Sequence, residues 1–336
     1  MFPRPNPVPA PRRLVVVGSV IAEIVMSVPD LPVTGGGTRA SRSVSRAGGG
    51  FHVLVAARRA GLETALAGVV GTGPMAQLVA ARLQDEDVHV LLPSREGDQG
   101  FVVVLAEPDG TTAQIASPGV EATLDADDLA KVRLRDDDVA YLSARDLLEP
   151  TAATAIARWC DSDAGLAGAL LVLDPGPLVA DVPDDVLDAV LERTDVLAVG
   201  VHELELLGGG GGDRERVLAD LADLLAPEGI VLLRLADDHF VVHEQGAGSF
   251  AFPADAPGPP RLAQVRHLLA QLAELRSARS RPADLEALPR IEASATLRPL
   301  QPLRDRGEGG ARGRVHGGGA GWRARERPPS ALFAGE

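Results

Sequence analysis

The chain has 336 residues, of which 45% are hydrophobic, so it can form one large α/β domain or two ordinary ones. Its net charge of −14 argues against a general nucleic-acid binder. A single cysteine, Cys160, excludes a disulfide framework and any multi-cysteine metal site, and therefore predicts a reducing compartment, the cytoplasm.

The first elements suggest a buried strand followed by an exposed strand pair. Residues 1–12 are Pro-rich, lack the order of a signal peptide, and are expected to form a flexible tail. No apolar run approaches the length of a membrane span, so no membrane partner is predicted. Residues 14–17 are a continuous apolar run, typical of a strand buried on both faces, and Gly18-Ser19 follows it. Residues 21–28 alternate only weakly and lead through Gly, Ser and Arg to Arg46, which favours exposed strands.

The stretch 47–61, AGGGFHVLVAARRAG, combines a glycine turn with a predicted helix. Alanine and valine recur behind the glycines at three- and four-residue spacing, as on one face of a helix. A glycine turn at a helix N-terminus directs backbone N–H groups at a hydroxyl or an anion. The alternative interpretation is a tight strand-to-helix turn that binds no ligand.

The next segment predicts further strands and a hairpin. Residues 62–70 and 88–92 read as strands, with a helix over 75–85 between them. Residues 100–107 and 111–117 flank Pro-Asp-Gly, a turn sequence typical of a β-hairpin. Two β excursions, near 20–46 and 98–117, are therefore expected to form a small sheet beside the main domain.

The middle of the chain alternates strands with helices. Strands are predicted at 139–142, 169–173, 196–199 and 229–233, and helices at 125–131, 151–160, 184–192 and 214–225. This alternation indicates a parallel sheet covered by helices on both faces.

The order of strand, Gly18-Ser19, glycine turn, helix and glycine-ended strand resembles the ribokinase-like (PfkB) carbohydrate kinases, over residues 13–257. The resemblance implies an α/β three-layer sandwich with a mostly parallel central sheet and a small β lid that closes over the sugar. It also implies transfer of the ATP γ-phosphoryl group, with Mg²⁺, to a hydroxyl of a sugar, sugar phosphate or nucleoside. Lids of this family often pair, which implies a homodimer.

The same resemblance assigns the sugar site. Glu23 stands where the family has an aspartate after G-S, and His52 replaces the asparagine of G-G-x-x-x-N. Asp98-Gln99-Gly100 matches the T-G step of the lid. The expected substrate-binding residues are Glu23, Gly48, Gly49, Gly50, His52, Gln99 and Gly100.

For the nucleotide end, Glu203 matches the glutamate of N-x-x-E, which organises Mg²⁺ and the phosphates, although Gly200 replaces its asparagine. One carboxylate that reaches Mg²⁺ through water suits this hard cation. Arg234 and Ala236 fall in the segment that matches the nucleotide-contacting T-L-G-x-x-G, where both glycines are replaced.

The resemblance stops near Pro257. The family's D-T-x-G-A-G-D, which supplies an anion hole and the general base, is replaced by GPPRLAQVRH at 258–267, so no catalytic residue is assigned. Up to residue 260 there are 19 basic and 39 acidic residues, whereas residues 261–336 hold 14 arginines and eight acidic residues. We expect a domain at 13–260 and a mostly disordered, Arg/Gly/Pro-rich tail at 261–336.

Three hypotheses remain open at this point. The chain is a working kinase with an unrecognised base, a non-catalytic sugar- or nucleoside-binding protein, or the inactive product of a frameshifted kinase gene. Arginine supplies all basic residues except Lys131, which suggests GC-rich codons. A single-base shift near codon 258 would then yield a long tail of this composition.

Overall fold

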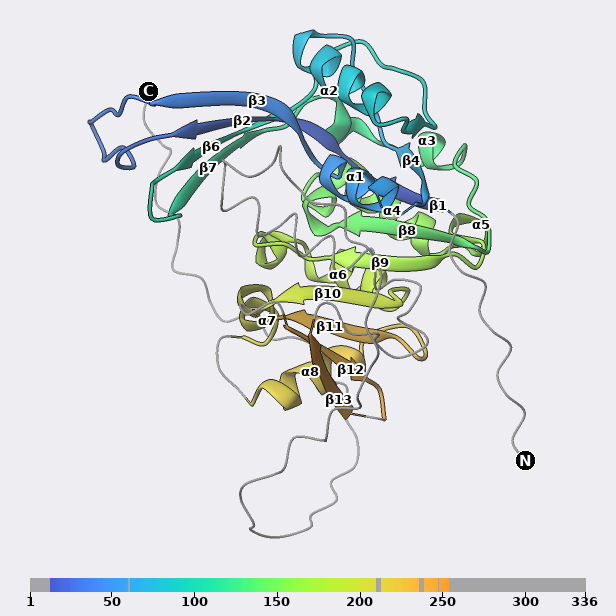
Figure 1. Cartoon of the computed structure of the whole chain (residues 1–336). Coiled ribbons are helices and arrows are strands. Elements are labelled where there is room, and N and C mark those ends of the chain that lie inside the picture. The colour runs from blue at the N-terminus through green and yellow to red at the C-terminus, as the bar shows by residue number, and fades with distance from the viewer. Residues whose placement is uncertain (1–12, 60, 210–212, 236–238, 247, 254–336) are drawn as a thin grey trace, which may run out of the picture. The chain divides into compact units, whose positions relative to one another are not determined.

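The computed structural model describes residues 13–253 except residues 60, 210–212, 236–238 and 247, and these described residues lie in one compact unit (Figure 1). The expected tails, residues 1–12 and 261–336, lie outside this part. Within it, no helix is long and apolar enough to cross a bilayer.

A central sheet of nine strands has the order β13-β12-β11-β10-β9-β8-β1-β4-β5. The strands from β11 to β5 run parallel, and an antiparallel hairpin, β12–β13, extends one edge. The bounds are β1 Arg13–Val17, β4 Glu63–Ala67, β5 His89–Val90, β8 Asp138–Ser143, β9 Leu170–Asp174, β10 Val196–Gly200, β11 Ile230–Arg234, β12 His239–Glu244 and β13 Gly248–Pro253.

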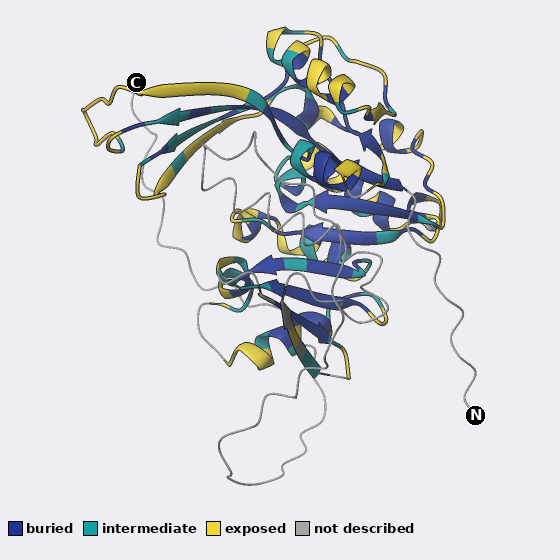
Figure 2. Ribbon diagram, in the orientation of Figure 1, coloured by how far each residue is buried: buried dark blue, intermediate teal, exposed yellow. Residues whose placement is uncertain are grey.

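Both faces of the sheet are covered, because successive side chains of each strand enter different apolar cores. In β1, Val15 and Val17 belong to one core and Leu14 and Val16 to the other. Helices α1 (Phe51–Arg59) and α2 (Pro74–Asp85) contribute to the second core, and α4 (Pro150–Asp161), α6 (Asp184–Leu191), α7 (Val201–Leu207) and α8 (Arg214–Ala222) contribute to the first. Figure 2 shows the central strands buried between these layers, so the predicted three-layer sandwich is confirmed.

A second sheet, which we call the lid, has the order β3-β2-β6-β7. Its strands are β2 Val20–Ser27, β3 Arg42–Gly49, β6 Phe101–Ala106 and β7 Thr112–Ser117. Strand β2 begins three residues after β1 ends, so the lid starts at the carboxyl end of β1 (Figure 1). The small sheet predicted from the two β excursions is therefore present.

Short elements complete the described part, and two of them differ from the prediction. The helix expected over 125–131 is a single turn, α3 (Ala126–Leu129), because its N-cap Asp125 forms a capping box with Asp128 but the chain leaves the helix at Ala130. The strand expected over 88–92 shortens to the two residues of β5 at the sheet edge. The other short elements are α5 (Asp163–Leu166), η1 (Val120–Thr123), η2 (Ala144–Leu147) and η3 (Val179–Asp181).

Candidate functional site

A cavity of about 220 Å³ lies at the carboxyl ends of β1, β8, β9, β10 and β11. Parallel sheets bind ligands at this edge, where the connections from neighbouring strands diverge to opposite sides. Here β1 lies between β4, which follows it through α1, and β8, which comes much later in the chain. The sheet order therefore opens a crevice beside Ser19.

The glycine turn predicted from sequence forms one wall of this cavity. Gly49 and Gly50 line it, whereas Gly48 does not. Gly49 has a left-handed φ of +63°, which favours glycine, and a Cβ at Gly50 would lie 2.6 Å from Val16 Cγ1. A Cβ at Gly48 would overlap the Glu23 carboxylate. All three positions therefore require glycine, for two different reasons.

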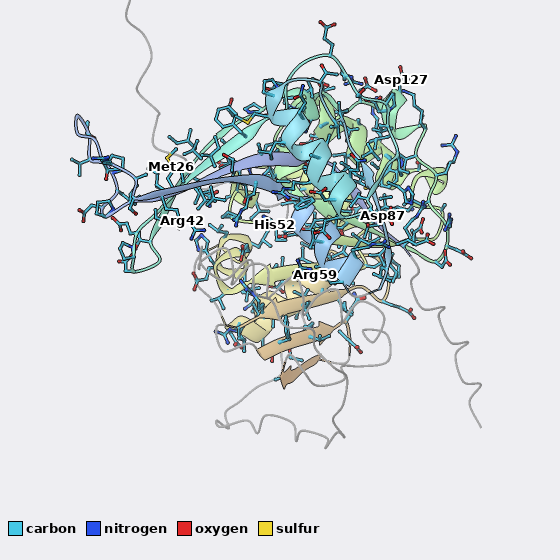
Figure 3. The ribbon with its side chains drawn as sticks, turned by 45° about the horizontal axis from the view of Figure 1, so that its top comes forward. Met26, Arg42, His52, Arg59, Asp87 and Asp127 are labelled. Carbon is cyan, nitrogen blue, oxygen red and sulfur yellow. The ribbon has the colours of Figure 1, made fainter. Side chains whose placement is uncertain are left out.

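Glu23 and His52, both predicted from sequence, are brought together at the base of the lid. Figure 3 labels His52, which lies at the start of α1. Glu23 is only 5% exposed, and its Oε2 accepts a hydrogen bond from Arg46 Nε at 2.9 Å and lies 3.3 Å from His52 Nε2. The sequence analysis did not assign Arg46. The signal that identifies it is strand pairing, since Arg46 lies directly opposite Glu23 in the β2–β3 pair. None of the three residues lines the cavity.

Gln99 and Gly100 lie outside the cavity wall and connect the lid to the central domain. The Gln99 amide donates to Val20 O at 2.7 Å and Val69 O at 3.2 Å, and accepts from Gly71 N at 3.0 Å. Gly100 N donates to Glu121 Oε2 at 2.7 Å. These polar groups are already bound within the protein, so the structure gives both residues a bracing role.

Asp146 is a site residue that the sequence analysis missed. It lies in η2 after β8, lines the cavity, and accepts a hydrogen bond from Ser19 N at 3.0 Å on Oδ1. Burial raises the pKa of Asp146 to about 6, and the charge of Glu121 adds to the shift. A Cβ at Gly18 would overlap this carboxylate. The only sequence signal was its place just after a predicted parallel strand.

Asp174, at the end of β9, is a second carboxylate that the sequence analysis did not assign. Its Oδ2 accepts a hydrogen bond from Tyr141 Oη at 2.6 Å, and its Oδ1 accepts one from Gly176 N at 3.1 Å. These bonds fix the carboxylate on the cavity wall, where its side chain keeps limited exposure. Tyr141 also lines the cavity and comes from the neighbouring strand β8.

Glu203 and Arg234, the residues predicted for the nucleotide end, line the same cavity. Glu203 occupies the first turn of α7, and its Oε2 accepts a hydrogen bond from Gly200 N at 3.0 Å, which caps that helix. Arg234 is the last residue of β11. Ala236 lies outside the described residues.

A family model described as pfkB family carbohydrate kinase matches residues 11–255. The chain belongs to the pfkB family. It is 26% identical over 196 residues to the uncharacterized sugar kinase YegV of Escherichia coli, covering 58% of this chain and 60% of that protein. It is 30% identical over 203 residues to an ATP-dependent ribose-1-phosphate kinase of Halopiger xanaduensis, covering 58% and 64%. The match therefore spans less than two thirds of either relative.

Among solved structures, a ribokinase from Thermotoga maritima superposes with a TM-score of 0.61 at 16% identity, covering 83% of this chain and 96% of that one. This likeness shows that the pfkB domain has the ribokinase-like fold expected from the sequence. The segment at 258–267, which aligns with the family's general-base motif, lies outside the described residues.

The cavity fits a magnesium ion that arrives with a nucleotide. In residues 13–253, where described, no group of three or more His, Cys, Asp or Glu side chains could hold a metal ion. Mg²⁺ needs no such group, because it keeps several waters and takes one or two carboxylates plus substrate phosphates. Glu203, in the first turn of α7, lines the cavity and would supply such a carboxylate.

Proposed function

We propose that this pfkB-family chain binds a sugar or nucleoside in the cavity, as an ATP-dependent kinase does, and that its phosphoryl transfer is absent or slow. The observation that carries the proposal is the convergence of Gly49, Asp146, Asp174, Glu203 and Arg234 on one cavity at the carboxyl edge of the sheet. These residues come from five separate places in the chain.

The cavity divides chemically into two ends. The Asp146 and Asp174 carboxylates accept hydrogen bonds from sugar hydroxyls, while Glu23 and His52 shape the base of the lid. The Arg234 guanidinium offers donors to a phosphate group. When bound, Mg²⁺ held by Glu203 directly or through water would neutralise charge on the nucleotide phosphates.

Weak turnover follows from the sequence beyond residue 257, which does not contain D-T-x-G-A-G-D. Phosphoryl transfer depends on positioning and charge stabilisation, so losing an anion hole is severe. A positioned base contributes about 10²–10⁴-fold by itself. One observation favours the alternative of a working kinase: Asp146, with a pKa of about 6, is a carboxyl suited to accept a proton in this cavity.

The test combines calorimetric binding with an ATP-dependent phosphorylation panel of pentoses, hexoses, hexose phosphates and nucleosides. We expect binding of at least one panel member and no turnover. Turnover that disappears in Asp146→Asn but survives in Asp85→Asn, a surface carboxylate on α2, would establish the working kinase instead. If the chain shows no binding and no turnover with any panel member, the proposal is refuted. In that case D-T-x-G-A-G-D in another forward frame past codon 258 would identify a frameshifted gene.

We also propose that the protein acts in the cytoplasm as a homodimer that pairs through the lid. The outer strands β3 and β7 expose Val44 and Ile115, the latter by 69%, which supports a covered surface there. Light scattering tests the dimer: Ile115→Glu should yield a monomer if the lids pair, and a monomeric parent chain would exclude this arrangement.

A further inference from the structure

A second cavity, of about 110 Å³, adjoins the first between the base of the lid and η2. Four residues line both cavities: Ser19, Arg145, Asp146 and Leu178. The two spaces are therefore compartments of one cleft, and Asp146, which accepts a hydrogen bond from Ser19 N, lies where they adjoin. A ligand that fills only the first compartment leaves the second to solvent.

The two compartments differ in chemistry. Asp146, Asp174, Glu203 and Arg234 line the first compartment. The second is predominantly apolar, with side chains from the lid, the η1 region, the η2–α4 segment and the β9–η3 connection: Ile21, Phe101, Leu124, Leu148 and Leu178. Phe101, at the start of β6, adds an aromatic ring to this lining. Such a lining favours an apolar or aromatic group over a hydroxylated one.

Charge in the second compartment decides against an anionic substituent. Three carboxylates line it, on Glu121, Asp146 and Glu149, against one guanidinium, on Arg145. Glu121 is held in place because its two oxygens accept hydrogen bonds from Gly100 N at 2.7 Å and Gly119 N at 2.9 Å. A phosphate here would meet more like charge than Arg145 offsets.

We propose that the ligand of this chain is a neutral nucleoside, with its sugar in the first compartment and its ring in the second. The inference rests on the proposed function, because it assigns the sugar to the cavity already described. It adds that the ring supplies much of the affinity. It also predicts discrimination against free sugars, which leave the apolar compartment empty, and against sugar phosphates.

The test is calorimetric titration of the full chain with ribose, ribose 5-phosphate and adenosine. Adenosine should bind at least 10-fold more tightly than ribose, and ribose 5-phosphate no more tightly than ribose. Phe101→Ala should weaken adenosine binding at least 10-fold and change ribose binding less than 3-fold. Val103→Ala is the matched control, because Val103 lies on the same strand and outside both linings, and it should change neither.

Ala116→Phe is a second variant, which places a ring in the compartment from β7. Because Ala116 is exposed and lines only the second cavity, this change does not remove core packing. It should block adenosine and spare ribose. Equal binding of ribose and adenosine, or a Phe101→Ala effect no larger than that of Val103→Ala, would overturn the inference and leave the proposed function standing. Tightest binding by ribose 5-phosphate would overturn it in favour of an Arg145 phosphate site. Binding of none of the three probes, nor of any panel member, would overturn both proposals.

Discussion

Replacing Asp146 by asparagine tests whether the buried, ionised carboxylate destabilises the folded protein. Asparagine keeps an oxygen that accepts the hydrogen bond from Ser19 N and has nearly the same size, but it removes the charge. Because Asp146 is enclosed between Gly18, Ser19 and the two cavities, its ionised form is poorly solvated in the folded protein. The variant should therefore be more stable than the parent at neutral pH.

The magnitude follows from the pKa. Burial raises the pKa of Asp146 from 3.8 to about 6, and roughly two units at about 1.4 kcal/mol each give an upper value of about 3 kcal/mol. Asp146 retains partial exposure, so we expect a free-energy difference of about 1–2 kcal/mol. The native state holds this proton more tightly than the unfolded state. The stability it contributes is thus present below pH 3.8 and is lost as pH rises through about 6.

Denaturant unfolding at pH 4 and pH 7.5 measures this difference. Asp146→Asn and the parent should be nearly equally stable at pH 4, and the variant should gain about 1–2 kcal/mol at pH 7.5. The surface control Asp85→Asn should stay within about 0.5 kcal/mol of the parent at both pH values. A gain that does not depend on pH, or a parent that is the more stable at pH 7.5, would refute the reasoning.

Two further changes probe the Arg13–Asp138 ion pair, at the amino ends of β1 and β8, and the glycine turn. Asp138→Ala leaves the buried Arg13 guanidinium without its carboxylate, so unfolding should become easier by about 3–5 kcal/mol; a loss below 1 kcal/mol in a denaturant titration would contradict this. Gly48→Ala places a methyl group against the Glu23 carboxylate, so it should cost about 1–3 kcal/mol and weaken ligand binding in calorimetry. Gly37→Ala meets no atom within 4 Å and should change neither, and equal behaviour of the two variants would be the contrary result.

Local pattern was enough to determine the architecture. The apolar run 14–17 predicted a strand buried on both faces, and the strand–helix alternation predicted the parallel sheet. Both predictions work because the number of buried faces determines which positions of a segment are apolar. The Pro-Asp-Gly turn predicted the β6–β7 hairpin for the same local reason. The glycine turn was predicted from the residues themselves, and the resemblance to the pfkB family assigned Glu203 and Arg234. The structure places Gly49, Gly50, Glu203 and Arg234 on one cavity.

Only the tertiary structure decided the rest of the cleft. Asp146 and Asp174 carry no local signature, and they line the cavity because the sheet order places β8 beside β1 and β9 beside β8. Gln99 matched a sugar-binding position, yet its amide is hydrogen-bonded to three backbone groups, at Val20, Val69 and Gly71, that are distant from it in the sequence. The physical reason is that pattern along the chain reports which face is buried, whereas the partners of a polar group depend on segments that meet only after folding.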